Sequence, residues 1–163
     1  MSDIFALARQ LGDVLKQRQL VLATAESCTG GGVAEAITEI AGSSAWFDCG
    51  FVTYSNAAKM RLLHVPEHVL AQHGAVSDQT AAAMCTGAIA NSLASVAVST
   101  TGIAGPDGAV PGKPVGTVYF GWAIGDQVTT QRMEFIGNRQ AVREQSVAHA
   151  LQTLLSLLQK SQA

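Results

Sequence analysis

The sequence predicts an α/β fold, a single-domain three-layer α/β/α sandwich with a mixed sheet. Short apolar, β-branched runs alternate from the start of the chain with runs of helical periodicity. Glycine-rich segments follow two of the apolar runs, as is common for loops at the carboxyl ends of strands. Gly125-Asp126 reads as a two-residue hairpin connection, so the strands that flank it must be antiparallel. The length of 163 residues is close to the roughly 150 residues of one domain, which predicts one domain over residues 1–163.

The first half of the chain is predicted to alternate helices and strands. Apolar residues three or four positions apart indicate helices, and aromatic or β-branched runs favour strands. The predicted elements are a helix over 1–18, a strand over 20–25, a helix over 32–40, a strand over 46–54 and a short helix that Ser55 or Asn56 caps. Tyr54 is therefore expected to end a strand, and Lys59 to lie one turn into a helix.

The second half contributes three further strands. Pro66 suits the first turn of a short helix that ends at Gly74, and Ser77 can cap a longer, alanine-rich helix. The predicted elements are helices over 66–74 and 77–93, strands over 96–101, 115–124 and 127–136, and a closing helix over 138–159. The hairpin between the last two strands makes the sheet mixed.

The composition excludes several classes of partner. Charged residues make up only 13% of the chain and hydrophobic residues 48%, which predicts a homo-oligomer, a dimer or larger. The chain has no basic run, with 10 Lys and Arg against 12 Asp and Glu, so no nucleic-acid partner is expected. No run reaches the roughly 18 apolar residues of a membrane span. The three cysteines are odd in number and widely spaced, which favours a reducing cytoplasm over a disulfide framework.

Ser27 lies in the most informative segment, Ala25-Glu26-Ser27-Cys28-Thr29-Gly30-Gly31-Gly32, at a predicted strand-to-helix turn. The glycines allow a tight turn that directs N–H groups at one point, and the following helix adds a positive end. A nucleophile and the donors for an oxyanion can thus share this turn. The alternative is that Ser27 or Thr29 only caps the helix.

Lys59 and Tyr54 can complete a catalytic group with Ser27. A metal-free amidase needs a base for its nucleophile, and a lysine serves only when burial makes it neutral near pH 7. The alanine-rich surroundings of Lys59 permit such burial, and the Tyr54 hydroxyl can pass a proton beside it. A surface lysine beside a core tyrosine is the alternative. Cys28 is a rival nucleophile, because a thiol at a helix N-terminus has a lowered pKa.

Other chemistries fit the sequence less well. Tyr54 and Lys59 are one residue too far apart for the Y-x-x-x-K pair of short-chain dehydrogenases, and no G-x-G-x-x-G follows the first strand. The S-x-x-K motif of penicillin-binding proteins is also missing from the sequence. His64, His68 and His73 look clustered, but Pro66 disrupts the spacing that a metal site needs. No metal and no cofactor are expected.

A second glycine-rich loop, Gly102-Ile103-Ala104-Gly105-Pro106-Asp107-Gly108, follows the predicted strand over 96–101. Its backbone N–H groups and the hydroxyls before it can hold a phosphate or a ribose, although the same glycines also suit a plain wide turn. Arg143 on the last helix can supply the permanent charge that a phosphate needs, or it can simply face water.

Five separated segments together resemble the nicotinamide-nucleotide amidohydrolases of the CinA carboxy-terminal domain family. These segments are the two glycine-rich ones, Phe51-Val52-Thr53-Tyr54-Ser55-Asn56 with Lys59, Gly74-Ala75-Val76-Ser77, and Lys113-Pro114-Val115-Gly116-Thr117-Val118. The family hydrolyses nicotinamide mononucleotide (NMN) to nicotinate mononucleotide and ammonia without a metal. The resemblance further implies the stand-alone form, without the amino-terminal domain of longer members.

The resemblance implies a role for each matching residue. Ser27 would be the nucleophile, Lys59 the base and Tyr54 an assistant in proton transfer. The glycine-rich segments would hold the nucleotide through Thr29, Gly30, Gly31, Gly102, Ala104 and Gly105, while Arg143 at the phosphate is an inference from its charge alone. A regulatory module that binds a nucleotide without catalysis is the alternative.

Overall fold

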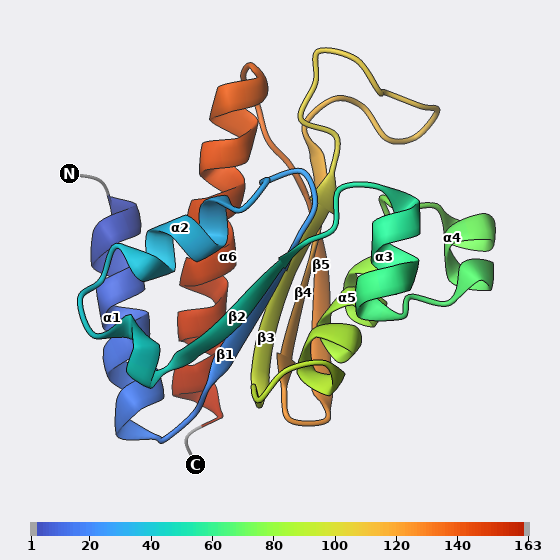
Figure 1. Ribbon diagram of the computed structural model, residues 1–163. Coiled ribbons are helices and arrows are strands. Elements are labelled where there is room, and N and C mark those ends of the chain that lie inside the picture. Colours follow the sequence, from blue (N-terminus) through green and yellow to red (C-terminus); the bar gives the residue numbers. More distant parts are fainter. Residues whose placement is uncertain (1–2, 162–163) are drawn as a thin grey trace.

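A computed structural model describes residues 3–161 as a five-stranded sheet with helices on both faces (Figure 1). The helices are α1 (Asp3–Gln17), α2 (Gly32–Thr38), α3 (Asn56–Leu63), α4 (Glu67–His73), α5 (Asp78–Ala90) and α6 (Arg139–Lys160), with a short 3₁₀ turn at Ser43–Ala45. The strands are β1 (Leu22–Glu26), β2 (Phe47–Val52), β3 (Val96–Gly102), β4 (Thr117–Ile124) and β5 (Gln127–Glu134). The predicted α/β class, the α/β/α layers and the mixed sheet are confirmed.

The strands lie in the order β2-β1-β3-β4-β5. β1 pairs in parallel with both β2 and β3, whereas β4 is antiparallel to its two neighbours. The chain runs from β1 outward to β2 and returns on the other side of β1 to form β3. The crevice between β1 and β3 is therefore the point where the direction of winding reverses, and ligands of open α/β sheets bind at such a point.

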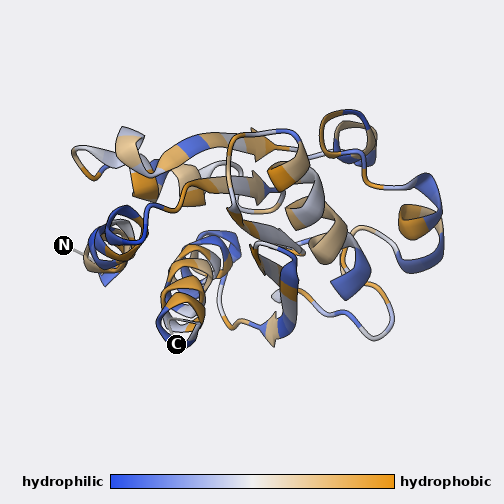
Figure 2. Cartoon of the chain, turned by 90° about the horizontal axis from the view of Figure 1, so that it is seen from below, coloured by the Kyte–Doolittle hydropathy of each residue, from blue (hydrophilic) through white to orange (hydrophobic). Residues whose placement is uncertain are grey.

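Two apolar cores stabilise the sandwich, one on each face of the sheet. The larger core joins α1, α2 and α6 to the sheet, and the smaller one lies under α3, α4 and α5. Figure 2 shows hydrophobic residues along the strands between the layers, while α1 and α6, which lead to the chain termini, mix hydrophobic and hydrophilic residues. No helix among residues 3–161 is long and apolar enough to cross a bilayer.

Most predicted elements are present with shifts of a few residues at their ends. Ser55, Ser77 and Asn138 cap α3, α5 and α6, and each side chain accepts a hydrogen bond from the backbone N–H three residues later. Pro66 is the N-cap of α4 rather than a residue of its first turn, and α5 ends at Ala90 instead of near Leu93. These differences leave the topology unchanged.

Candidate active site

The parallel pairing of three strands brings the candidate residues to one edge of the sheet. Glu26 at the end of β1 is in register with Val52 in β2 and Thr100 in β3. Ser27 follows β1 directly, and its N–H donates to the carbonyl oxygen of Thr100 at 2.9 Å. The residues after β2, including Tyr54, emerge at the same edge.

Ser27 and Lys59 are in direct contact. The Nζ atom of Lys59 lies within hydrogen-bond distance of the Oγ atom of Ser27, at 3.0 Å, and donates to the carbonyl oxygens of Thr53 at 3.0 Å and Tyr54 at 3.3 Å. The Lys59 side chain is only 1% exposed, and within residues 3–161 no carboxylate forms an ion pair with it. Burial lowers the pKa of Lys59 below its usual value of 10.5, an effect that the nearby Cys28 thiol partly opposes.

Ser27 and Lys59 line a cavity of about 270 Å³. Its wall also includes Tyr54, Val76, Asp107 and Arg139, together with the loop from Thr101 to Gly105. Gly102, Ala104 and Gly105 of the second glycine-rich segment therefore lie beside the Ser27–Lys59 pair. The cavity is at the strand edge that the topology favours for a ligand.

The Glu26 carboxylate holds the first glycine-rich turn in place through hydrogen bonds. Its carboxylate is 1% exposed and accepts hydrogen bonds from the Thr29 hydroxyl at 2.6 Å and from the N–H groups of Gly31, Val33 and Ala34 at 3.2, 2.9 and 2.9 Å. The N-terminal donors of α2 are thus bound to Glu26. The expectation that this helix end faces a developing charge beside Ser27 is wrong, because Glu26 occupies these donors.

We expect Glu26→Ala to lower the free energy of unfolding by about 3 kcal/mol, because three backbone N–H groups and the Thr29 hydroxyl would lose a charged acceptor. Urea unfolding followed by circular dichroism measures the change. Glu26→Gln, which keeps one carbonyl acceptor, should lose less. An equal, small change in both variants would show that the carboxylate does not hold the turn.

The same turn leaves few N–H groups for an oxyanion. Gly30 has φ +61° and Gly31 has φ +102°, conformations that favour glycine, and the Gly30 N–H donates to the Ser27 carbonyl at 3.0 Å. Gly31 is bound to Glu26. Across residues 3–161, by contrast, the backbone N–H of Thr29 has no hydrogen-bond acceptor. Of the predicted binding residues in this turn, Thr29 is thus the one with a free backbone donor.

Cys28 is not set up as a nucleophile. Its side chain is 5% exposed, and burial raises the pKa of the Cys28 thiol to about 12. The lowered pKa expected for a thiol at a helix N-terminus is wrong, because α2 begins four residues later and burial in an apolar environment dominates. Cys28, Cys49 and Cys85 are all free thiols.

Tyr54 and Arg139 lie at the mouth of the cavity. The Tyr54 ring is 61% exposed, and its hydroxyl accepts a hydrogen bond from Arg139 at 2.9 Å. Lys59 contacts the backbone carbonyl of Tyr54 instead of this hydroxyl. Arg139 also donates to the Gly105 carbonyl at 2.8 Å, so it links the two sides of the mouth. The sequence interpretation did not single out Arg139, although its place directly after the Asn138 cap put it at the start of the last helix.

Arg143 lies on the other side of the Ser27 turn. Its Nε and Nη2 atoms donate to the carbonyl oxygens of Cys28 and Thr29, each at 3.2 Å. It does not line the cavity of Ser27 and Lys59, but a separate cavity of about 490 Å³ whose lining includes Glu35 and Glu144. The structure therefore places Arg143 as a support of the turn and not beside the cavity.

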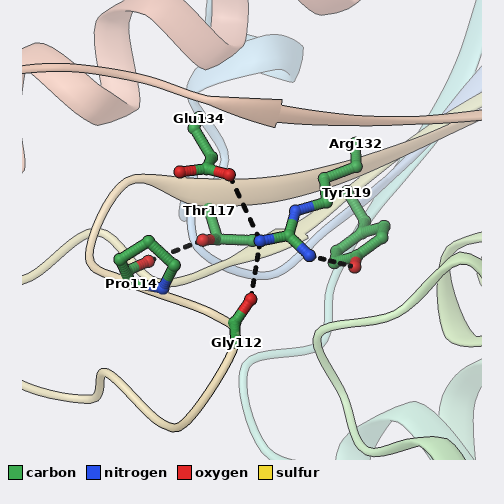
Figure 3. A network of polar contacts seen from close by, with 6 residues as sticks. All are labelled: Gly112, Pro114, Thr117, Tyr119, Arg132 and Glu134. Carbon is green, nitrogen blue, oxygen red and sulfur yellow. Dashed lines mark hydrogen bonds and ion pairs between the residues drawn. The ribbon is translucent and has the colours of Figure 1, made fainter.

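The long loop between β3 and β4 is held by polar contacts with β4 and β5 (Figure 3). Arg132 donates to the Gly112 carbonyl at 2.7 Å and to the Tyr119 hydroxyl at 3.3 Å, and it also pairs with Glu134 at 3.3 Å. The Thr117 hydroxyl donates to the Pro114 carbonyl at 2.6 Å. These contacts fix the far part of the loop whose first residues line the cavity.

The three histidines that are close in sequence do not come together. His64 is the C-cap of α3, whereas His68 and His73 lie in α4, and all three are exposed. Within the described part of the chain, no group of three or more His, Cys, Asp or Glu side chains is arranged to hold a metal ion.

Comparisons with known proteins agree with this fold. The sequence model of the CinA C-terminal domain matches residues 4–158. A crystal structure of a CinA superfamily protein from Klebsiella pneumoniae superposes with a TM-score of 0.94 at 39% identity, covering 98% of this chain and 99% of that chain. The fold is thus that of an α/β protein of the CinA superfamily.

The chain belongs to the CinA C-terminal domain family, and the resemblance found in the sequence is confirmed. It is 54% identical over 157 residues to a Pseudomonas putida protein named nicotinamide-nucleotide amidohydrolase PncC, covering 96% of this chain and 98% of that protein. An Escherichia coli K12 protein of the same name is 54% identical over 154 residues, which cover 94% of this chain and 93% of that protein.

Proposed function

We propose that this protein hydrolyses the carboxamide of NMN, giving nicotinate mononucleotide and ammonia, with Ser27 as the nucleophile and Lys59 as the base. The 3.0 Å contact between Ser27 and a buried lysine carries the proposal. Burial disfavours the charged form of this lysine and so favours its role as a proton acceptor. The names of the relatives supply the class of substrate.

The first half of the reaction forms an ester on Ser27. Neutral Lys59 takes the proton of the Ser27 hydroxyl while the Oγ atom attacks the carboxamide carbon. The backbone N–H of Thr29 stabilises the oxygen that becomes negative. When the C–N bond breaks, Lys59 returns its proton to the nitrogen, and ammonia leaves.

In the second half of the reaction, water hydrolyses the ester on Ser27 and the protons follow the same path through Lys59. Lys59 takes a proton from the attacking water, the carbon–oxygen bond to Ser27 breaks, and the proton passes to the Ser27 oxygen. The carbonyl oxygens of Thr53 and Tyr54 keep the Lys59 amine directed at Ser27 throughout. The Tyr54 hydroxyl, which contacts Arg139 at the mouth of the cavity, assists the transfer of protons.

Residues of both glycine-rich segments hold the nucleotide. Gly102, Ala104 and Gly105 line the cavity itself, whereas Thr29, Gly30 and Gly31 do not line it and act by shaping the turn that follows Ser27. Release of ammonia from NMN by the purified protein tests this function. Tight binding of NMN without ammonia release would favour the alternative of a regulatory module that binds the nucleotide without catalysis.

We expect treatment with a chelator such as EDTA to leave ammonia release unchanged, because the proposed steps use only side chains and backbone groups of the protein. The measurement compares kcat for NMN before and after dialysis against the chelator. Loss of activity that added zinc restores would overturn the metal-independent mechanism.

A further inference from the structure

Two basic side chains line the cavity, Lys59 and Arg139, and the proposed chemistry uses only Lys59. Lys59 is bound to Ser27 at the inner end, whereas Arg139 is exposed at the mouth. The only ion pair among residues 3–161 joins Arg132 to Glu134, so no carboxylate neutralises Arg139. Asp107 lines the same cavity without pairing with this guanidinium.

The Arg139 guanidinium is held in place but retains free donors. One Nη atom donates to the Gly105 carbonyl at 2.8 Å and the other to the Tyr54 hydroxyl at 2.9 Å. A guanidinium has five N–H donors, so three remain. These two contacts fix the orientation of the planar guanidinium before any ligand binds. The guanidinium therefore loses less entropy when it binds a phosphate through two parallel hydrogen bonds.

The space around Arg139 extends beyond the cavity of Ser27 and Lys59. Arg139 and Ala104 also line an adjoining cavity of about 510 Å³, together with Pro106, Val115 and Asn138. The reacting pair does not line this second cavity. In NMN the ribose separates the carboxamide from the phosphate. A nucleotide with its carboxamide at Ser27 can therefore extend past Ala104 and place its phosphate at Arg139.

We propose that Arg139 binds the phosphate of the substrate and makes the enzyme specific for a nucleotide over the corresponding nucleoside. The inference rests on the proposed function, since it places the carboxamide at Ser27. Arg143, the other arginine of α6 near the turn, does not fit this role because its guanidinium binds the carbonyl oxygens of Cys28 and Thr29 outside the cavity.

The test measures binding in the Ser27→Ala background, where no turnover interferes. Isothermal titration calorimetry gives the affinities for NMN and for nicotinamide riboside, which lacks only the phosphate. Arg139→Met should weaken NMN binding about 10- to 100-fold and leave riboside binding unchanged, because the loss is confined to the charge-assisted bonds with phosphate. Arg143→Met, the matched control, should change both affinities by the same factor.

An unchanged affinity for NMN in the Arg139→Met variant would overturn the inference, as would equal losses for NMN and the riboside. If the riboside binds too weakly to measure, ribose 5-phosphate replaces it, and its affinity must fall in Arg139→Met but not in Arg143→Met. Failure of the proposed function gives a different result. The parent protein would then release no ammonia from NMN, although Arg139→Met would still weaken NMN binding selectively.

Discussion

Ser27→Ala is expected to reduce ammonia release from NMN by at least about 10⁴-fold, because the substitution removes the attacking atom. The Oγ atom of Ser27 contacts Lys59, and Glu26 and Thr100 hold the surrounding turn through groups that the substitution keeps. The fold and the affinity for NMN should therefore stay close to those of the parent. Ammonia release at saturating NMN and calorimetric binding separate the two effects.

Cys28→Ala is the matched control for this prediction. The thiol is adjacent in sequence but buried, and the raised pKa keeps it protonated near neutral pH. The variant should keep most of the parent activity. Activity that survives Ser27→Ala and disappears in Cys28→Ala would identify the thiol as the nucleophile.

Lys59→Arg is expected to lower kcat on the order of 10²–10⁴-fold, the range for loss of a general base. Arginine keeps a positive charge but cannot lose its proton near neutral pH, so it separates proton transfer from charge stabilisation. Lys59→Met removes both the charge and the base while keeping an unbranched side chain, and it should be equally inactive. Ammonia release per enzyme at saturating NMN measures the loss, and circular dichroism checks that each variant is folded. Turnover near the parent level in Lys59→Arg would make Lys59 a structural residue.

The pH dependence of kcat in the parent protein tests the same role. Only neutral Lys59 takes the Ser27 proton, and its pKa is lowered by burial, so kcat should rise with pH through an apparent pKa below 10.5. A kcat that falls as pH rises through this region would mean that the charged form of the lysine is the active one.

The pairing of Ser27 with Lys59 could be anticipated from the sequence because it follows from element order. Ser27 follows one predicted strand and Lys59 lies one turn into the helix after the next, and in the structure these strands are parallel, so their carboxyl ends meet at one sheet edge. The caps at Ser55 and Ser77 could likewise be predicted from the sequence. A helix cap is a local feature, since the hydroxyl lies three residues before the N–H group that it accepts from.

The contacts that join distant segments were not predictable in the same way. Arg139 and Arg143 share a helix, and the sequence cannot show that the first turns toward Gly105 while the second reaches the carbonyl oxygens of Cys28 and Thr29. Glu26 was also missed, because a carboxylate in a strand gives no sign that it will be buried under the next helix.

The central claim, that Lys59 is a neutral base in the free protein, can be tested by the titration of its side chain. The chain has four lysines, Lys16, Lys59, Lys113 and Lys160, so ¹³C labelling at Cε gives few resonances, and the one missing from Lys59→Arg belongs to Lys59. We predict that this resonance titrates with a midpoint clearly below 10.5, because burial disfavours the charged form of Lys59. A Lys59 midpoint at or above 10.5 would contradict the proposed mechanism.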